Sequence, residues 1–179
     1  MTGPCFVDAN VFVYAGDPRD ASKERRAIAW LDLLWREQRG RTSVQVLSES
    51  YVVLKRLALA RGSTQDMWHS VQKYFVWNPL AIDETVLRRA HEIEQRFRIS
   101  WWDSMIVAAA QLQDCTLLLT EDLQDNGVYG TVTVRSPFTL EVREAAATYA
   151  VTNEAMRRAA SPHRPRGRPR RVPQSNLNP

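Results

Sequence analysis

Two hydrophobic patterns alternate along most of the chain. Short apolar runs of strand length alternate with longer stretches in which apolar residues recur every three or four positions. The short runs are typical of buried strands, and the longer period is typical of helices with one buried face. We therefore expect strands at Cys5–Asp8, Thr42–Val46, Asn78–Ile82, Thr116–Thr120 and Thr131–Arg135. Between them we expect helices at about 22–38, 47–60, 64–76, 84–97 and 102–113.

This order of elements predicts the fold class. Strands separated by helices are typical of an α/β domain, in which helices cover both faces of a mainly parallel sheet. Several of the predicted helices begin at a capping signal. These signals are Ser63 with Asp66, Asp83, and Ser100 with Asp103.

The pattern weakens towards the carboxyl end, which divides the chain into three parts. We expect residues 1–144 to form the α/β domain and residues 145–160 to form a helical extension. Residues 161–179 contain five of the nine prolines and almost no large apolar side chains, so we expect a disordered tail there. Residues 157–179 hold seven Arg and no acid, whereas residues 1–156 hold 17 basic and 20 acidic side chains. The body is therefore mildly acidic and the tail strongly basic.

Composition narrows the class of protein. With 44% hydrophobic and 25% charged residues, the chain has the balance of an ordinary soluble domain. No apolar run approaches the ~20 residues of a membrane-spanning helix, and Asp8 comes before any stretch of signal-peptide character. We therefore expect a cytoplasmic protein without a membrane contact, in which Cys5 and Cys115 are reduced and buried.

Two acids follow predicted strands directly. Asp8 ends the first strand, and Asp122 comes two residues after Thr120, where another strand ends. The carboxyl ends of parallel strands face the ligand crevice in folds of this class, so both acids are candidate site residues. Each also has a structural interpretation, Asp8 as a turn residue and Asp122 as the cap of a short helix. The sequence leaves open which of Asp122, Glu121 and Asp125 points inward.

Two further acids lie on predicted helices. Glu49 shares a helical face with apolar residues such as Val52, although a solvated pair with Arg56 is the alternative. Asp103 heads a long apolar run, where burial of a carboxylate is costly unless a partner receives it. The structural alternative for Asp103 is a capping box with Ser100.

Taken together, the four acids indicate a metal site. Positions at the carboxyl ends of parallel strands converge on one edge, where four carboxylates repel one another and raise each other's pKa. No Lys or Arg stands beside these acids at a strand end, and the three His lack the spacing of metal ligands. An oxygen-only ligand set favours Mg²⁺ or Mn²⁺ over zinc.

Four motifs in order give the chain a specific resemblance. They are "FVDANVFVY", "VLSESY", "WWDSMIVAAA" and "LLTEDLQD", which carry Asp8, Glu49, Asp103 and Asp122. Over residues 6–143 they resemble the PIN domain, in particular the VapC-type toxin ribonucleases of type II toxin–antitoxin systems. The resemblance implies a Rossmann-like α/β/α sandwich with a short, mainly parallel sheet, and Mg²⁺- or Mn²⁺-dependent endonucleolytic cleavage of RNA. It also implies a homodimer and a cognate antitoxin protein that blocks the site.

The resemblance assigns roles to individual residues. All four acids are implied to be catalytic, and a metal ion would be held by Asp8, Asp103 and Asp122. Water activated in this way attacks the phosphorus in line and leaves a 5′ phosphate, and Glu49 would help to recruit a second ion. The polar residues that match pocket-lining positions are Asn10, Ser104 and Thr120. Two further acids of the motifs, without an assigned role, are Glu121 and Asp125.

Basic residues supply candidate contacts to nucleic acid. The tail segment "RPRGRPRR" resembles the AT-hook, which places arginines in the minor groove of A·T-rich DNA. The alternative is a polybasic tail that binds any nucleic acid through counterion release. The arginines of this segment are Arg164, Arg166, Arg168, Arg170 and Arg171. Candidate phosphate contacts beside the crevice are Arg25, Arg26, Lys55, Arg56 and Arg61.

Two other functions fit part of the pattern. A phosphoacceptor signalling domain also gathers acids and Mg²⁺ at strand ends, but it needs a Lys where this chain ends its last strand with Arg135. The second alternative is a nucleic-acid-binding module of the PIN fold, or a nuclease outside a toxin–antitoxin pair, tethered to DNA by the tail. The presence of all four acids favours an enzyme over a module with inert acids.

Deleting residues 157–179 is expected to weaken nucleic-acid binding without removing the chemistry, because the tail adds positive charge but no acid. Affinity for a single-stranded RNA should fall most at low salt, and the slope of log K against log[salt] should become shallower. Fluorescence anisotropy over a salt series measures both the affinity and the slope. Loss of cleavage at saturating substrate would contradict this division of labour.

Overall fold

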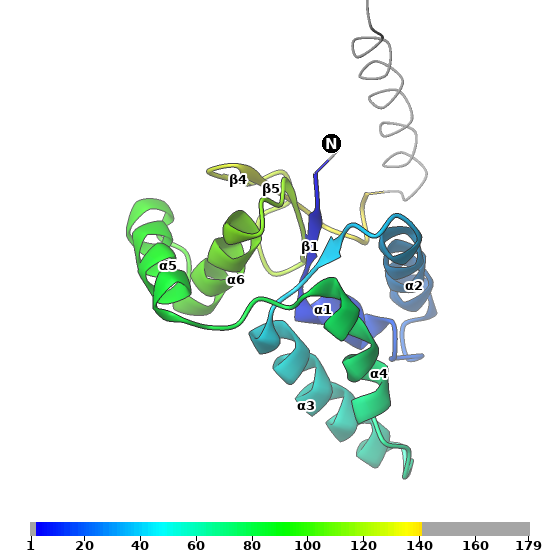
Figure 1. The fold of residues 1–179 in the computed structure, drawn as a ribbon. Coiled ribbons are helices and arrows are strands. Elements are labelled where there is room, and N and C mark those ends of the chain that lie inside the picture. The colour runs from blue at the N-terminus through cyan, green and yellow to red at the C-terminus, as the bar shows by residue number, and fades with distance from the viewer. Residues whose placement is uncertain (1–2, 141–179) are drawn as a thin grey trace, which may run out of the picture.

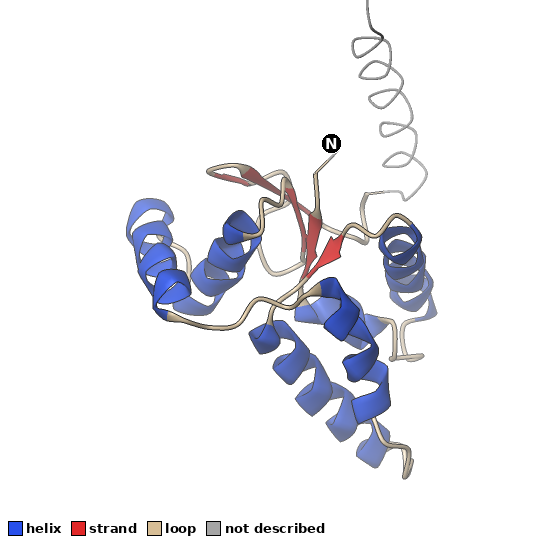
Figure 2. Cartoon of the chain, viewed as in Figure 1, coloured by secondary structure: helices blue, strands red, loops and turns tan. Residues whose placement is uncertain are grey.

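A short, mainly parallel sheet lies at the centre of the domain (Figures 1 and 2). The computed structural model describes residues 3–140. Their strands are β1 (Cys5–Val7), β2 (Gly40–Arg41), β3 (Leu117–Leu119), β4 (Val128–Tyr129) and β5 (Val132–Arg135). The strand order is β2-β1-β3-β5-β4, and each neighbouring pair is parallel except β4 with β5. The predicted α/β class is confirmed.

Helices cover both sides of this sheet and extend beyond its carboxyl edge. They are α1 (Ala9–Tyr14), α2 (Ala21–Arg36), α3 (Val44–Ala60), α4 (Trp68–Gln72), the 3₁₀ helix η1 (Lys73–Trp77), α5 (Glu84–Phe97) and α6 (Trp101–Leu112). In Figure 1, α2 lies on one side of the sheet and α5 and α6 lie on the other, while α1, α3 and α4 gather below the end of β1. The result is an α/β/α sandwich with an open carboxyl edge.

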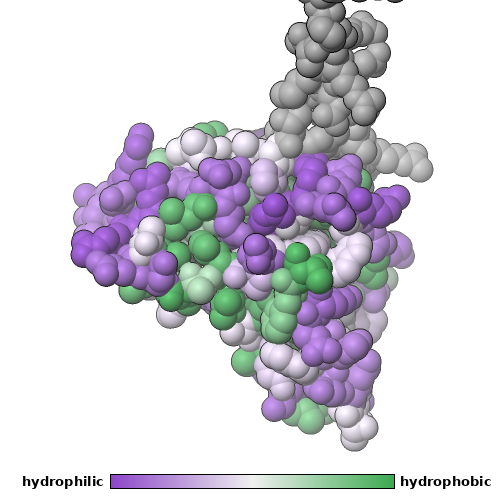
Figure 3. Space-filling view, in the orientation of Figure 1, coloured by the Kyte–Doolittle hydropathy of each residue, from purple (hydrophilic) through white to green (hydrophobic). Residues whose placement is uncertain are grey.

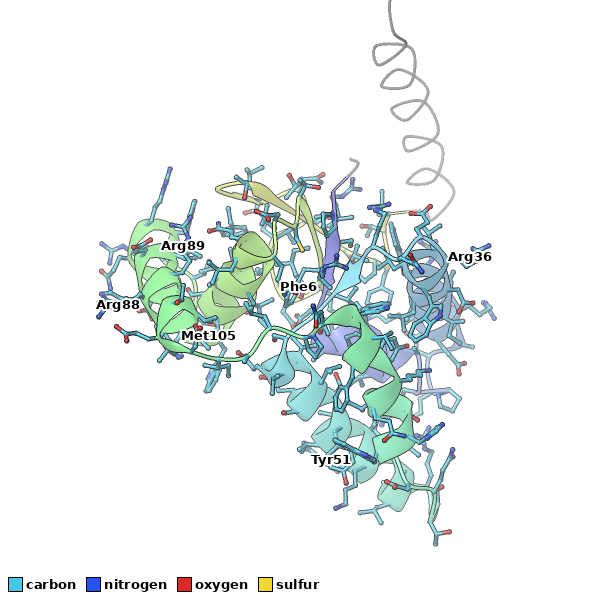
Figure 4. All side chains as sticks on the ribbon, viewed as in Figure 1. Phe6, Arg36, Tyr51, Arg88, Arg89 and Met105 are labelled. Carbon is cyan, nitrogen blue, oxygen red and sulfur yellow. The ribbon has the colours of Figure 1, made fainter. Side chains whose placement is uncertain are left out.

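The two central strands, β1 and β3, are covered on both faces. Every side chain of β1 and β3 is buried, and Phe6 points into the middle of the domain (Figure 4). The register pairs Val7 with Leu119, so both strands end at the same level. The next residues, Asp8 and Thr120, therefore emerge side by side at the carboxyl edge.

Two predicted strands are wrong. Thr42–Val46 is not a strand, because Ser43 caps α3 by accepting a hydrogen bond from the Val46 amide, and the valines that follow form a helix. The neighbouring strand is β2, two residues earlier. Asn78–Ile82 is also not a strand: Asn78 adopts a left-handed conformation with φ of 56°, and Leu80 makes only an isolated bridge to Ser43.

The predicted helix at 64–76 begins later and changes type. Ser63 and Asp66 accept hydrogen bonds from the amides of Gln65 and Trp68, so they form successive turns and not a capping box. The helix starts at Trp68 and tightens into the 3₁₀ helix η1. Helix α1 and strand β4 were missed, since each is too short to show a period.

Other predictions hold. The helix over 84–97 is confirmed with Asp83 as its cap, and α2, α3 and α6 lie within a few residues of their predicted positions. The boundary at 144, the extension over 145–160 and the tail over 161–179 lie outside the described residues. Among residues 3–140, the helices are too short or too polar to cross a bilayer.

Candidate active site

Asp8 is buried at the junction of β1 and α1. It caps α1 by accepting a hydrogen bond from the Ala9 amide at 2.6 Å, while only 7% of the residue is exposed. Its other oxygen, Oδ2, accepts a hydrogen bond from the hydroxyl of Thr120 at 2.7 Å. Asp8 is therefore both the turn residue of its structural interpretation and a carboxylate that faces the end of β3.

Thr120 and Asn10 connect Asp8 to a second acid. Thr120 Oγ1 accepts hydrogen bonds from the Asn10 side chain at 3.0 Å and from the backbone amide of Asp122 at 3.1 Å. Asn10 Nδ2 also donates to Asp122 Oδ2 at 3.1 Å and lies 3.4 Å from Asp8 Oδ2. These four residues form one hydrogen-bonded cluster, which we call the edge cluster.

The structure distinguishes the three acids that follow β3. Asp122 turns toward Asn10 and joins the edge cluster. Glu121 pairs with Lys23 at 2.5 Å on the side facing α2. Asp125 accepts hydrogen bonds from the Ser136 amide and from Arg135, so it closes the turn after β5. Asp122 is exposed, but it is the acid of the three that bonds to the edge cluster.

Glu49 lies across a groove from the edge cluster. Its helix, α3, packs against α1, and Gln45 donates a hydrogen bond to its carboxylate at 3.1 Å. Glu49 and Asn10 both line a groove of about 590 Å³ between α1 and α3. The charge of Glu49 is close enough to raise the pKa of Asp8.

Asp103 stands apart from the edge cluster. Its carboxylate accepts a hydrogen bond from the Ser100 hydroxyl at 2.7 Å, and its amide donates back to that hydroxyl at 3.1 Å. This is the reciprocal capping arrangement that was its structural alternative. Among residues 3–140, Asp103 does not join Asp8 and Asp122 in a group that could hold a metal ion. Ser104, the next residue, is fully buried and its hydroxyl has no partner in the described region.

Burial without a cation makes Asp8 a weak acid. Desolvation raises its pKa to about 6, with smaller contributions from the charges of Asp122 and Glu49, while the hydrogen bonds from Thr120 and Ala9 oppose the rise. No Lys, Arg or His of the described chain forms an ion pair with Asp8 or Asp122. Within residues 3–140, no cationic side chain therefore compensates the charge of these two acids.

The edge cluster has the chemistry of a hard-cation site. Asp8 and Asp122 supply carboxylate oxygens, and the buried Oδ1 of Asn10 has no hydrogen-bond partner among residues 3–140. Oxygen donors of this kind suit Mg²⁺ or Mn²⁺. In the arrangement described, no three His, Cys, Asp or Glu of residues 3–140 form a ready-made metal group, since Asp103 is turned to Ser100. The residues fit the ion in type, with two acids in place.

Asp8→Asn should stabilise the metal-free protein at neutral pH. The folded pKa of about 6 lies above the ordinary 3.8, so the folded state holds a proton that the unfolded state has lost between these values. The contribution of Asp8 to the free energy of unfolding is then fully present below about pH 4 and is lost as the pH rises through about 6. A shift of roughly two units corresponds to about 3 kcal/mol. Urea unfolding in EDTA should show this decline in the wild type and not in D8N; parallel pH profiles would refute it.

One protein family matches most of the chain. A PIN domain family profile matches residues 5–124, more than half of the chain. Among solved structures, the crystal structure of VapC20 from Mycobacterium tuberculosis, a Sarcin-Ricin loop cleaving toxin, matches with a TM-score of 0.47 and 19% sequence identity, covering 66% of this chain and 89% of that one. A search of curated proteins gives no significant match. On the family profile and its extent, the chain belongs to the PIN domain family.

Proposed function

We propose that the protein is a Mg²⁺- or Mn²⁺-dependent endoribonuclease that hydrolyses RNA phosphodiester bonds. The observation that carries the proposal is the edge cluster, in which buried Asp8 is linked through Thr120 and Asn10 to Asp122, and neither acid has an ion pair with a cation among residues 3–140. A site of this kind favours a divalent cation and, with it, a phosphate ligand. Membership of the PIN domain family supports the same reaction class.

The residues of the site divide the work between binding the ion and holding its ligands. Asp8, Asp122 and Asp103 are the proposed ligands, and a bound ion supplies an activated water at neutral pH. Thr120 fixes the Asp8 carboxylate through its hydroxyl. Asn10 holds Asp122 against the end of β3. Glu49, from the opposite wall of the groove, is placed to orient water or substrate from that side.

The groove also favours a protein partner. Its wall includes Val13, Val52 and Val53 beside Glu49, and Val52 is 55% exposed. An apolar groove that leads to an acidic site suits a segment that covers both, as the proposed antitoxin of a toxin–antitoxin pair would do. Figure 3 shows further apolar side chains gathered near the middle of the visible face, which supports a proposed homodimer. Contact of the basic tail with DNA is proposed from its sequence alone.

Substituting any one of the four acids by its amide should lower RNA cleavage in Mg²⁺ or Mn²⁺ by roughly 100-fold or more, since each removes a ligand or positioning charge. Single-turnover assays on a labelled RNA measure this for D8N, E49Q, D103N and D122N. The matched control is E92Q on the surface of α5, where an exposed carboxylate pairs with Arg89.

The chemistry of the product tests the same proposal independently. Water attack leaves a 5′ phosphate and a 3′ hydroxyl, which labelling with kinase and mass spectrometry identify. A 2′,3′-cyclic phosphate, or cleavage that persists in EDTA and in all four amide variants, would contradict the proposal.

A further inference from the structure

A lysine that the sequence analysis did not single out lies beside the edge cluster. Lys23, in the first turns of α2, donates hydrogen bonds to Glu121 at 2.5 Å and to the hydroxyl of Tyr14 at 2.9 Å. Glu121 immediately precedes Asp122, and Tyr14 is the last residue of α1. The ammonium of Lys23 therefore connects three segments at the rim of the site.

Aromatic rings hold this ammonium in place independently of Glu121. Its nitrogen lies 4.3 Å from the ring centre of Tyr14 and 4.9 Å from that of Phe138, and the two rings contact each other edge to face. The segment of Phe138 is itself tied to α2, because Trp30 and Arg26 donate hydrogen bonds to the carbonyls of Pro137 and Phe138. Lys23 is thus pre-positioned by cation–π contacts and the Tyr14 hydroxyl.

The ion pair between Lys23 and Glu121 can be exchanged for another anion more easily than the aromatic contacts of Lys23 can be broken. The side chains of Lys23 and Glu121 are 31% and 26% exposed, so water reaches both partners. Partly exposed ion pairs contribute little net stability, typically about 1 kcal/mol or less. A phosphate oxygen can replace the carboxylate of Glu121 while Lys23 stays in its aromatic setting.

The position of Lys23 relative to the groove indicates which ligand would replace the carboxylate of Glu121. Glu121 and Tyr14, the two hydrogen-bond partners of Lys23, line the same groove as Asn10 and Glu49. A polyanionic strand that reaches the edge cluster along this groove passes both partners. Arg56 lines the same groove, and Lys23 offers a second cation beside Tyr14 and Glu121.

We propose that the Lys23 ammonium binds a phosphate of the RNA strand in this groove, exchanging the carboxylate of Glu121 for a non-bridging phosphate oxygen. The inference rests on the proposed function in that it takes RNA as the ligand. Glu121 then acts as an internal competitor that holds the lysine when no RNA is bound. This gives a role to an acid that neither joins the edge cluster nor closes a turn.

A double-mutant cycle tests the exchange. Binding of a short fluorescein-labelled single-stranded RNA to the full-length protein is measured by anisotropy in EDTA over a KCl series, so cleavage does not interfere. K23M should weaken binding about fivefold and reduce the salt slope by roughly 0.7, the value for one phosphate contact on a single strand. E121Q should strengthen binding about twofold in the wild type and have no effect in the K23M background.

The matched control is R36M, which removes the same charge from the other end of α2. Arg36 points outward from the helix (Figure 4) and bonds only to a carbonyl of its own helix within the described residues, so its loss should leave affinity and slope unchanged. The proposal is overturned if K23M behaves like R36M. It is also overturned if E121Q strengthens binding equally with and without Lys23, because the effect is then general repulsion. If the variants give the predicted binding cycle but the wild-type protein cleaves no RNA in Mn²⁺, the result counts against the proposed function alone.

Discussion

The carboxylate of Asp8 is the constraint on which the site depends. It lies at the end of β1, where the same side chain caps α1, and desolvation raises its pKa, with no ion pair to a cation among residues 3–140. Two neighbouring side chains form hydrogen bonds around this carboxylate. Thr120 donates its hydroxyl, and Asn10 bridges to Asp122. The edge cluster is therefore a set of hydrogen bonds around a carboxylate that has no cationic partner within residues 3–140.

The parallel pairing of two short strands, β1 and β3, places the residues of the edge cluster together. Since β1 and β3 are paired in register and end at the same level, the residues that follow them meet without long loops. The three acids after β3 then divide by partner: Glu121 turns to Lys23, Asp122 to the edge cluster, and Asp125 to the turn after β5. Two of these three carboxylates, Glu121 and Asp125, therefore have cationic or amide partners of their own.

Sequence patterns predicted the parts of the site that strand periodicity controls. Asp8 and Thr120 follow fully buried apolar runs, and such runs identify a strand and its end. Patterns failed where local capping overrides β propensity, as at Ser43, which turns a valine-rich stretch into α3. For Asp103 the patterns left a capping box and a metal ligand as alternatives, and the structure shows the capping box. Lys23 was missed because its partners lie far away in the chain.

The central claim is that a divalent cation compensates the charge at this edge. Calorimetric titration of Mn²⁺ into the protein near pH 6, repeated in buffers of different ionisation enthalpy, tests it most directly, because Asp8 is half-protonated there and must release its proton to the buffer when an ion binds. The account predicts saturable binding with proton release, both lost in the D8N variant. Absence of binding, or binding with the same proton release in D8N, would contradict it.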